Sequence, residues 1–314
     1  MKVNKKRREF IRISTAGALG LVALGPMACK PGAKKNNPKE KSGAVDRKSF
    51  GVGIQLYTIR DAMAADVEGS LKKVSDLGYK YIELASYSDG KFYGYAPADF
   101  KKMVEDLGLK AVSSHAAVES KGITRENAQK MADDHAALGV EYCIQPWVNE
   151  QDRTIETYKK MIADWNEVGA IMKDAGVQFG YHNHNFEFKP TDGIVPYYDI
   201  FMPEMDPELI VMELDLYWAT KAGQNPVEMF EKYPGRFHLL HFKDMLENNG
   251  PYYDVIKDDI TSVGSGQIDF KSIYNAREIG GVKYYFVEDD NQGNGKPFKG
   301  IETSIKNITT KIAN

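Results

Sequence analysis

The stretch Gly176-Val177-Gln178-Phe179-Gly180-Tyr181-His182-Asn183-His184 contains the structural unit on which the whole fold is built. Its first glycine ends an upstream amphipathic run, because glycine readily adopts the left-handed conformation that closes a helix. A short apolar run then predicts a strand, and the strand finishes on polar side chains. Successive strand residues point to opposite faces, so His182 and His184 share one face and Asn183 takes the other. Two imidazoles on one face at the end of a strand predict a site rather than a core.

The same unit recurs from residue 50 onward, with strand-like runs alternating with helices that begin at proline or end at glycine. Eight such units in about 265 residues match a single parallel (β/α)8 TIM barrel. A doubly wound open sheet would show a glycine-rich turn after its first strand, whereas that turn here reads Gln55-Leu56-Tyr57-Thr58-Ile59-Arg60-Asp61. The predicted strands are 50–57, 80–85, 110–115, 141–147, 178–184, 209–214, 237–242 and 284–288. The predicted helices are 67–77, 97–107, 125–138, 155–175, 196–202, 226–232, 270–279 and 301–312.

The composition is that of an ordinary globular protein, with 42% hydrophobic and 27% charged residues. A net charge of -3 offers no basic surface for nucleic acid. Beyond the N-terminus, no apolar run reaches the roughly 18–20 residues that a membrane-spanning helix needs. The chain is therefore expected to act on small molecules.

The N-terminus, residues 1–29, is interpreted as a twin-arginine export signal. A basic region with paired Arg7 and Arg8 precedes a weakly hydrophobic run over 13–24, and Ala28-Cys29 closes it. A basic tail before a buried helix is the alternative. Residues 30–48 are rich in Lys, Pro, Asn and Gly and predict a flexible tether to a barrel over 49–314. The expected location is periplasmic, with membrane contact only if Cys29 carries a lipid anchor.

Cysteine usage is sparse, with two residues in the whole chain. If Cys29 is removed or acylated, Cys143 stays alone, and a structural disulfide is excluded even in an oxidising compartment. Cys143 lies in an apolar, strand-like run. It is therefore predicted to be an inert thiol of the core.

Titratable side chains end at least five of the predicted strands. In TIM barrels the site lies at the C-terminal ends of the strands, so these groups are expected to converge. Taken singly, a strand-end histidine is compatible with a structural role, Glu213 and Asp215 with helix caps, and Lys243 with a surface ion pair. Taken together, they predict a ring of nitrogen and carboxylate donors for a divalent cation. The titratable residues are Glu83, His115, His182, His184, Glu187, Glu213, Asp215, His241, Lys243, Asp244, Glu288, Asp289 and Asp290, and the fourth strand ends at Gln145-Pro146-Trp147.

Several short motifs, in their order and spacing from about Phe50 to the end of the chain, resemble the xylose-isomerase-like barrels. This family includes sugar isomerases and epimerases, inosose and dehydroshikimate dehydratases, and endonuclease IV. The motifs are Gly53-Ile54-Gln55-Leu56-Tyr57, Ser113-Ser114-His115, Tyr181-His182-Asn183-His184, Leu214-Asp215-Leu216-Tyr217-Trp218, His241-Phe242-Lys243-Asp244, Val263-Gly264-Ser265-Gly266-Gln267-Ile268-Asp269-Phe270 and Val287-Glu288.

The resemblance implies a metal bound by one donor from the fifth strand together with Asp215, His241 and Glu288. Many members carry glutamate on the fifth strand where this chain has His182, so the fourth ligand is either His182 or Glu187 from the following loop. Two imidazoles and two carboxylates suit Mn²⁺ or Zn²⁺, with Mg²⁺ and Co²⁺ as alternatives. Trp218 stands where many members have a substrate-contacting histidine, and it is expected to offer a stacking face for a sugar ring.

The resemblance also implies proton abstraction from a carbon next to a carbonyl, with the cation stabilising the resulting enediolate. His184 is the first candidate for the base, followed by Lys243 and His115, and Glu288 is a candidate for both ligand and base. The residues expected to bind substrate are Gln55, Glu83, Trp147, Glu187 and Trp218.

The substrate expected from the sequence is an unphosphorylated keto-sugar. Backbone N–H groups of Gly264-Ser265-Gly266 are compatible with a phosphate site, but a flexible loop and the export signal both argue against one. An isomerase or epimerase is the leading interpretation. The alternatives are a lyase or dehydratase that carries out β-elimination on a 3-keto-glycoside, and a sugar-binding barrel without turnover. The charge and the export signal oppose an endonuclease, and a homo-oligomer is left open.

Overall fold

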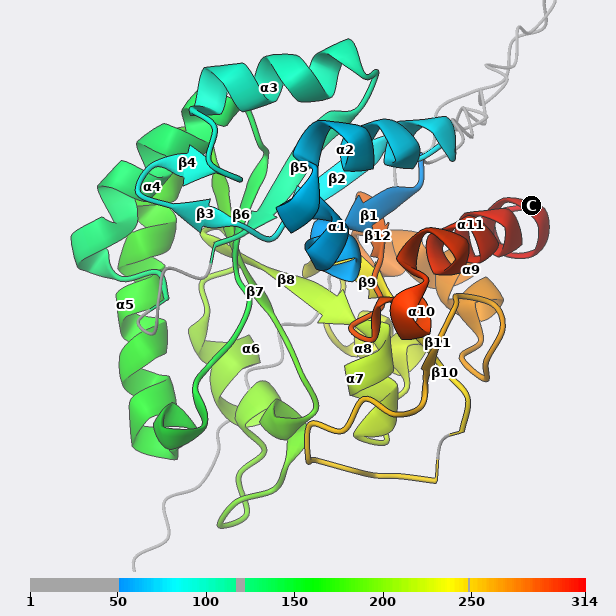
Figure 1. Cartoon of the computed structure of the whole chain (residues 1–314). Coiled ribbons are helices and arrows are strands. Elements are labelled where there is room, and N and C mark those ends of the chain that lie inside the picture. Colours follow the sequence, from blue (N-terminus) through cyan, green and yellow to red (C-terminus); the bar gives the residue numbers. More distant parts are fainter. Residues whose placement is uncertain (1–50, 117–121, 248) are drawn as a thin grey trace, which may run out of the picture. The chain divides into compact units, whose positions relative to one another are not determined.

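The computed structural model describes residues 51–116, 122–247 and 249–314. Eight strands close into a barrel in which neighbouring strands pair in parallel and follow the order of the chain (Figure 1). The predicted (β/α)8 barrel is confirmed. The barrel strands are β1 (Gly53–Gln55), β2 (Tyr81–Leu84), β5 (Lys110–His115), β6 (Tyr142–Gln145), β7 (Gln178–His182), β8 (Ile210–Asp215), β9 (Phe237–Phe242) and β12 (Tyr284–Val287).

Helices surround the barrel (Figure 1), and their ends follow local signals in the sequence. Asp66 accepts a hydrogen bond from the Gly69 N–H and begins α2, while Gly139, at φ 88°, ends α4 in the left-handed conformation. Among the described residues the helices are α1 (Arg60–Ala65), α2 (Val67–Asp76), α3 (Pro97–Asp106), α4 (Arg125–Leu138), α5 (Ile155–Asp174), α6 (Met202–Glu204), α7 (Leu216–Lys221), α8 (Pro226–Lys232), α9 (Phe270–Gly280), α10 (Gln292–Gly295) and α11 (Pro297–Asn307).

The interior of the barrel is divided into an apolar layer and a polar layer. On β8, Val211 belongs to a buried apolar cluster and Glu213 is the next residue on the same face. On β9, Leu239 and His241 stand in the same relation. The apolar layer therefore supports a polar layer nearer the C-terminal ends of the strands. The buried members of the apolar layer are Val112, Tyr142, Ile144, Val211, Leu239 and Phe286.

Two short antiparallel hairpins follow barrel strands and were not predicted, because strands of two residues carry no periodic pattern. One pairs β3 (Tyr87–Ser88) with β4 (Lys91–Phe92), and the other pairs β10 (Asp244–Met245) with β11 (Ile260–Thr261). The segment between β10 and β11 is held to the barrel by Asn185, whose Nδ2 donates to two carbonyl groups of that segment at 3.2 and 2.8 Å.

Five barrel strands are shorter than predicted, and the first and fifth of them end in turns near the polar layer. The first begins at Gly53 and ends at Gln55, whose side chain accepts the Tyr57 N–H at 2.9 Å and starts a 3-10 turn. The fifth ends at His182 instead of residue 184, and a 3-10 turn over Phe186–Phe188 follows it. Both changes lie at the C-terminal ends, where polar side chains bind backbone groups and compete with the sheet.

The predictions for residues 1–48, including the export signal, the tether and Cys29, lie outside the described residues, as does Phe50. Across the described part of the chain, no helix is both long enough and apolar enough to span a bilayer. Cys143 is a free thiol buried in the core, as predicted.

Candidate metal centre and pocket

Four predicted metal ligands lie together at the C-terminal end of the barrel. His182 ends β7, Asp215 ends β8, His241 lies in β9 and Glu288 follows β12. One ligand atom from each lies within 4.8 Å of the others, and all four side chains are buried. Two imidazoles and two carboxylates at such distances suit a Zn²⁺ or Mn²⁺ ion.

Asp215 uses its two carboxylate oxygens differently. Oδ1 accepts the Trp218 N–H at 2.9 Å and caps α7, so the helix-cap interpretation is correct for this oxygen. Oδ2 is buried and accepts no hydrogen bond among the described residues, although the Lys243 ammonium group lies 3.0 Å away as an ion-pair partner. It lies 3.8 Å from both His182 Nε2 and His241 Nδ1. A buried anionic oxygen that faces two imidazole nitrogens fits a cation, so the residues present match the implied metal.

Lys243 places a positive charge beside these ligands. Its Nζ lies 2.6 Å from Glu288 Oε2, 3.0 Å from Asp215 Oδ2 and 3.3 Å from Asp290 Oδ1. Burial by itself would lower the pKa of Lys243, but the surrounding carboxylates outweigh burial and raise it well above its ordinary value. The ammonium group therefore stays charged and neutralises part of the cluster.

A deeper layer of buried groups lies beneath the four ligands, and Glu213 is its central residue. Glu213 Oε2 lies 2.5 Å from His115 Nε2, 3.2 Å from His182 Nδ1 and 3.4 Å from His241 Nε2. Glu83 Oε2 lies 2.6 Å from the same nitrogen of His241. Sequence reasoning counted Glu213 among the converging strand-end groups, with a helix cap as the alternative, and assigned it no role in the site. Its position two residues before Asp215 was the available signal, because that spacing places both side chains on the inner face.

Charge separates the imidazoles into neutral and protonated groups. Burial and the charge of His241 lower the pKa of His182 to about 3, so its ring is neutral near pH 7, as a ligand must be. Burial and the neighbouring His182 lower the pKa of His184 well below its ordinary range. Burial also acts to lower the pKa of His241, but the facing carboxylates raise it well above that range. Metal uptake would therefore displace a proton from His241.

A cavity of about 360 Å³ adjoins the metal ligands and contains the candidate base. The ring of His184 contacts the ring of His182 edge to face, with centroids 5.1 Å apart. It is held by the ring of Trp147 at 4.6 Å and the stacked ring of Phe186 at 5.4 Å. Within the described chain, His184 Nδ1 is buried without a hydrogen-bond partner. The cavity is lined by Tyr57, Ala85, His115, Pro146, Trp147, His182, His184, Lys243, Lys257, Glu288 and Asp290.

All four residues proposed to move protons line this cavity, namely His115, His184, Lys243 and Glu288. Five lining residues were not predicted as parts of the site, namely Tyr57, Ala85, Pro146, Lys257 and Asp290. Tyr57, Ala85 and Pro146 were predicted only as parts of the ends of the first, second and fourth strands, and Asp290 only as part of the polar end of the eighth. No sequence signal marks Lys257, because it lies in the segment between β10 and β11, where its Nζ is 3.4 Å from Asp290 Oδ2.

Two predicted substrate contacts, Trp218 and Glu187, must be corrected because both side chains are fully buried. Trp218 packs under His184, with ring centroids 5.4 Å apart, and offers no stacking face to a sugar. Glu187 accepts the Tyr181 hydroxyl at 2.6 Å and the His184 N–H at 2.9 Å. Its two oxygens hold the turn after β7 in place, and the cluster of four potential ligands contains His182 instead.

Gln55 and Glu83 are corrected for the same reason, since both are fully buried and neither lines the cavity. Gln55 donates from Nε2 to Glu83 Oε2 at 2.9 Å. Burial and the charge of Glu213 raise the pKa of Glu83. Both residues therefore support the polar layer from below, and Trp147 is the one predicted substrate contact that lines the cavity.

The glycine loop after β11 has its N–H groups occupied. Gly264 and Gly266 donate to Asp244 Oδ2 at 2.9 and 2.8 Å, and Ile268 donates to Asp244 Oδ1 at 3.2 Å. A phosphate would have to displace this carboxylate. The geometry thus favours the structural interpretation of the loop over the phosphate site.

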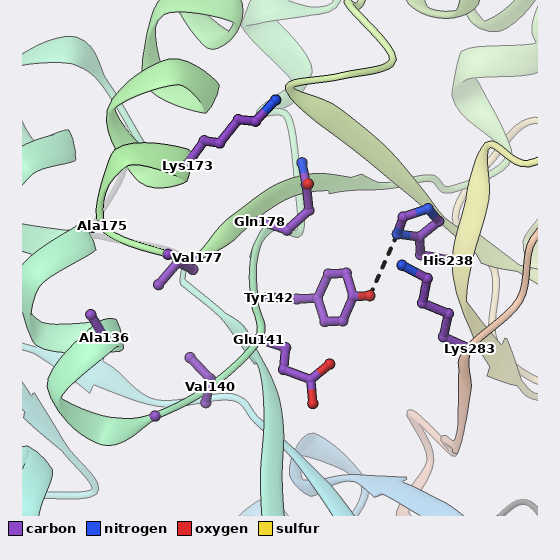
Figure 2. A pocket seen from close by; sticks show the side chains of 12 residues that line it. Ala136, Val140, Glu141, Tyr142, Lys173, Ala175, Val177, Gln178, His238 and Lys283 are labelled. Atoms are coloured by element: carbon purple, nitrogen blue, oxygen red, sulfur yellow. Dashed lines mark hydrogen bonds between the residues drawn. The ribbon is translucent and has the colours of Figure 1, made fainter.

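A larger hollow, of about 520 Å³, lies at the opposite, N-terminal end of the barrel. Figure 2 shows the Tyr142 hydroxyl directed at His238 Nδ1, at 3.4 Å, with Lys283 beside them. Burial and the charge of Lys283 lower the pKa of His238 to about 4, so the ring is neutral near pH 7. Its lining contains one carboxylate, Glu141, and one imidazole, His238, and neither belongs to a cluster of potential metal ligands among the described residues. The chemistry therefore belongs to the smaller cavity rather than the larger hollow.

Comparison with solved structures supports the same assignment of fold. A structure described as a sugar phosphate isomerase/epimerase from Parabacteroides distasonis is 29% identical, covers 88% of this chain and 99% of its own, and superposes with a TM-score of 0.71. The IolI protein, solved with a zinc atom, is 18% identical over 84% of this chain and 98% of its own, and shares the fold with a TM-score of 0.66.

Sequence comparison identifies relatives named inosose dehydratase. The one from Lacticaseibacillus casei is 24% identical over 157 residues, which cover 46% of this chain and 52% of that protein. The chain thus matches about half the length of this relative. The profile of a family described as the xylose isomerase-like TIM barrel matches residues 71–307. The chain therefore belongs to the xylose isomerase-like TIM-barrel family.

Proposed function

We propose that the chain is a divalent-metal-dependent isomerase or epimerase that removes a proton from the carbon next to the carbonyl of an unphosphorylated keto-sugar. The observation that carries the proposal is His184. Its imidazole is neutral near pH 7, its Nδ1 is unpartnered within the described residues, and it lines the same cavity as two of the four metal ligands. Relatives in the family include a protein described as a sugar phosphate isomerase/epimerase.

A divalent ion held by His182, Asp215, His241 and Glu288 would supply a Lewis acid that polarises the carbonyl oxygen of the sugar. His184 would accept the proton on its neutral imidazole, and the electron pair of the C–H bond would move toward the carbonyl oxygen. The ammonium group of Lys243, fixed by its carboxylate partners, offsets the negative charge that develops. Transfer of the proton to the neighbouring carbon would give isomerisation, and protonation of the same carbon from the opposite face by a second lining group, such as His115 or Lys243, would give epimerisation.

The charge of the cavity supports an unphosphorylated substrate. Its two lysines are engaged, with Lys243 near Glu288 and Asp290, and Lys257 within 3.4 Å of Asp290. A phosphate dianion would be repelled by these carboxylates, and both ammonium groups are already paired with them. An exported location, proposed from the N-terminal sequence, agrees, since phosphorylated sugars are scarce outside the cytoplasm.

A lyase or dehydratase is the second candidate, favoured by the similarity to inosose dehydratases. It would share the first step with the isomerase. The electron pair would then expel a group β to the carbonyl, and a protonated side chain would donate to that leaving group. His115 is available for this role, because Glu83 and Glu213 outweigh the effect of burial and raise its pKa. A sugar-binding barrel without turnover is disfavoured, since the four ligands are intact and adjacent.

Proton NMR in D₂O of the metal-loaded protein with a 3-keto-glycoside tests the proposal. Deuterium incorporation with an intact glycosidic bond supports an isomerase or epimerase. Release of the aglycone with an unsaturated keto-sugar supports the lyase. Loss of either signal on removal of the metal with a chelator, and its return on adding Zn²⁺ or Mn²⁺, checks the metal dependence. If the signal is unchanged in chelator, metal dependence is overturned.

A further inference from the structure

Each of the two histidine ligands faces two different sets of groups, one with each ring nitrogen. His182 directs Nε2 toward Asp215 Oδ2 at 3.8 Å and Nδ1 toward Glu213 Oε2 at 3.2 Å. His241 directs Nδ1 toward Glu288 Oε2 at 2.8 Å and Nε2 toward Glu83 Oε2 at 2.6 Å. In both rings, one nitrogen belongs to the ligand cluster and the other to the deeper layer.

We infer that Glu213 and Glu83 are positioning residues that accept the N–H of His182 and His241 and thereby present the opposite nitrogen of each ring to the metal. A neutral imidazole has one N–H and one lone pair, so a carboxylate that accepts the N–H selects the nitrogen that binds the ion. The inference rests on the proposed metal-dependent function and adds two residues that touch neither the ion nor the substrate cavity.

Burial makes this selection strong. Glu83, Glu213 and His241 are fully buried, and His182 is nearly so, which leaves water little access to compete for the ring nitrogens. Glu83 is itself held by Gln55, which donates to the same oxygen at 2.9 Å. The strand positions of both carboxylates, on β2 and β8, give them rigid backbones. The deeper layer therefore has the geometry and rigidity to orient both rings.

A second ion in the deeper layer is the competing interpretation. His115, His182, Glu213 and His241 offer ligand atoms within 4.8 Å of one another. Such an ion would require both shared histidines to bridge two metals through both nitrogens. It would also replace the short contacts His115 Nε2–Glu213 Oε2, at 2.5 Å, and His241 Nε2–Glu83 Oε2, at 2.6 Å. In the described chain, one oxygen of Glu83 and one of Glu213 are buried without hydrogen-bond partners, and both could bind a second ion. The test therefore also measures how many ions each chain binds.

The test measures Zn²⁺ affinity by chelator competition, and the number of ions bound, for the full chain and for Glu213→Gln and Glu83→Gln. Loss of an orienting carboxylate is expected to weaken binding about 10- to 100-fold. The control is Asp290→Asn, which also removes one carboxylate charge, but next to Lys243 and Lys257 rather than next to an imidazole. We expect the control to change affinity less than either test variant, because Asp290 faces Lys243 and Lys257 rather than a ligating ring.

Long-range proton–nitrogen NMR of the ¹⁵N-histidine-labelled, Zn²⁺-loaded wild type tests the inference even if a variant fails to fold. The expected result is metal at Nε2 of His182 and Nδ1 of His241, with protons on the opposite nitrogens. The reverse assignment, or two ions per chain, overturns the inference. So do variants that bind as tightly as the wild type. A wild type that binds no ion overturns the proposed metal centre as well. Failure of the positioning inference alone is therefore distinguishable from failure of the proposed function.

Discussion

The two ends of the barrel use the same eight strands but hold opposite kinds of side chain. At the N-terminal end, Tyr81, Tyr142 and Tyr284 pack edge to face, with centroids 5.1 and 6.3 Å apart. At the C-terminal end, carboxylates and imidazoles face one another in a buried layer. The tyrosine rings stabilise one another without a ligand, since aromatic rings attract in edge-to-face geometry. The second concentrates charge that burial disfavours, so this end of the barrel is shaped for a ligand rather than for stability.

The apolar layer between the two ends explains how one barrel accommodates both. Leu239 and Phe286 fill its middle, and the next inward residues along their strands are His241 and Glu288. The apolar layer excludes water from below, which strengthens every electrostatic interaction above it. Changing one end should therefore leave the other largely unaffected, and the following variants examine that expectation.

The largest effect is expected from Asp215→Asn at the C-terminal end. Asparagine keeps the cap of α7, since an amide oxygen also accepts the Trp218 N–H, but it removes the anionic oxygen that faces His182 and His241. We expect loss of metal affinity beyond the roughly 100-fold of an outer-shell change. Metal stoichiometry is measured on the purified protein. Full stoichiometry with undiminished affinity would show that the ligand cluster is assigned wrongly.

His184→Gln is expected to have the next largest effect. The substitution removes the base but leaves the four ligands, so deuterium exchange into the substrate should fall by about 10²- to 10⁴-fold. Metal affinity should stay close to that of the wild type, because His184 is not one of the clustered ligands. Exchange rates are measured by NMR under saturating metal. A normal rate would move the role of base to His115 or Lys243.

Lys243→Met separates the ammonium group from the ion. In the metal-free protein, the substitution leaves Asp215 and Glu288 buried without their cationic partner, and such a loss costs about 3–5 kcal/mol of unfolding free energy. Added Zn²⁺ should recover more stability in the variant than in the wild type, because a divalent ion replaces the missing charge. Denaturant unfolding with and without metal measures the difference. Equal gains in both proteins would contradict this account.

The smallest effect is expected at the N-terminal end, from His238→Gln. Burial, with the nearby positive charges of Lys283 and Arg236, lowers the pKa of His238 to about 4 in the folded chain. An unfolded histidine titrates near about 6.5. Between these values the unfolded chain binds a proton that the folded chain does not, so stability falls as the pH falls.

The variant should therefore lose less stability than the wild type between about pH 7 and about pH 5. Its metal affinity and deuterium exchange should be unchanged, which makes it the control for the three variants at the other end. Urea unfolding at both pH values provides the measurement. A change in metal affinity would show that the two ends are coupled through the apolar layer.

Much of this architecture could be predicted from the sequence, because it depends on local and periodic signals. The strands over Lys110–His115 and Phe237–Phe242 and the helix over Arg125–Leu138 agree with their predicted ranges to the residue. In each, the pattern of apolar residues and the bounding glycine or turn act over a few residues. The four potential ligands were found for the same reason, since each lies at or next to a strand end.

Local and periodic signals did not predict which side chains near the site are buried or which groups they hydrogen-bond to. Trp218 and Glu187 were expected in the cavity, and both are buried beneath it. Glu213 was considered as a helix cap and lies at the centre of the deeper layer. Lys257 enters the cavity from a segment without periodic pattern. Each of these outcomes depends on which segments, distant in sequence, come to lie against one another.

The sequence by itself thus determined the eight strand–helix units and the strand-end residues that gather at one mouth of the barrel. The alternation of side chains along a strand and the parallel closure of the sheet are sufficient for both results. Tertiary structure alone decided which nitrogen of His182 and His241 faces which carboxylate, and which polar groups line the cavity or support it. These relations depend on distances between strands, which the order of residues along one strand does not specify.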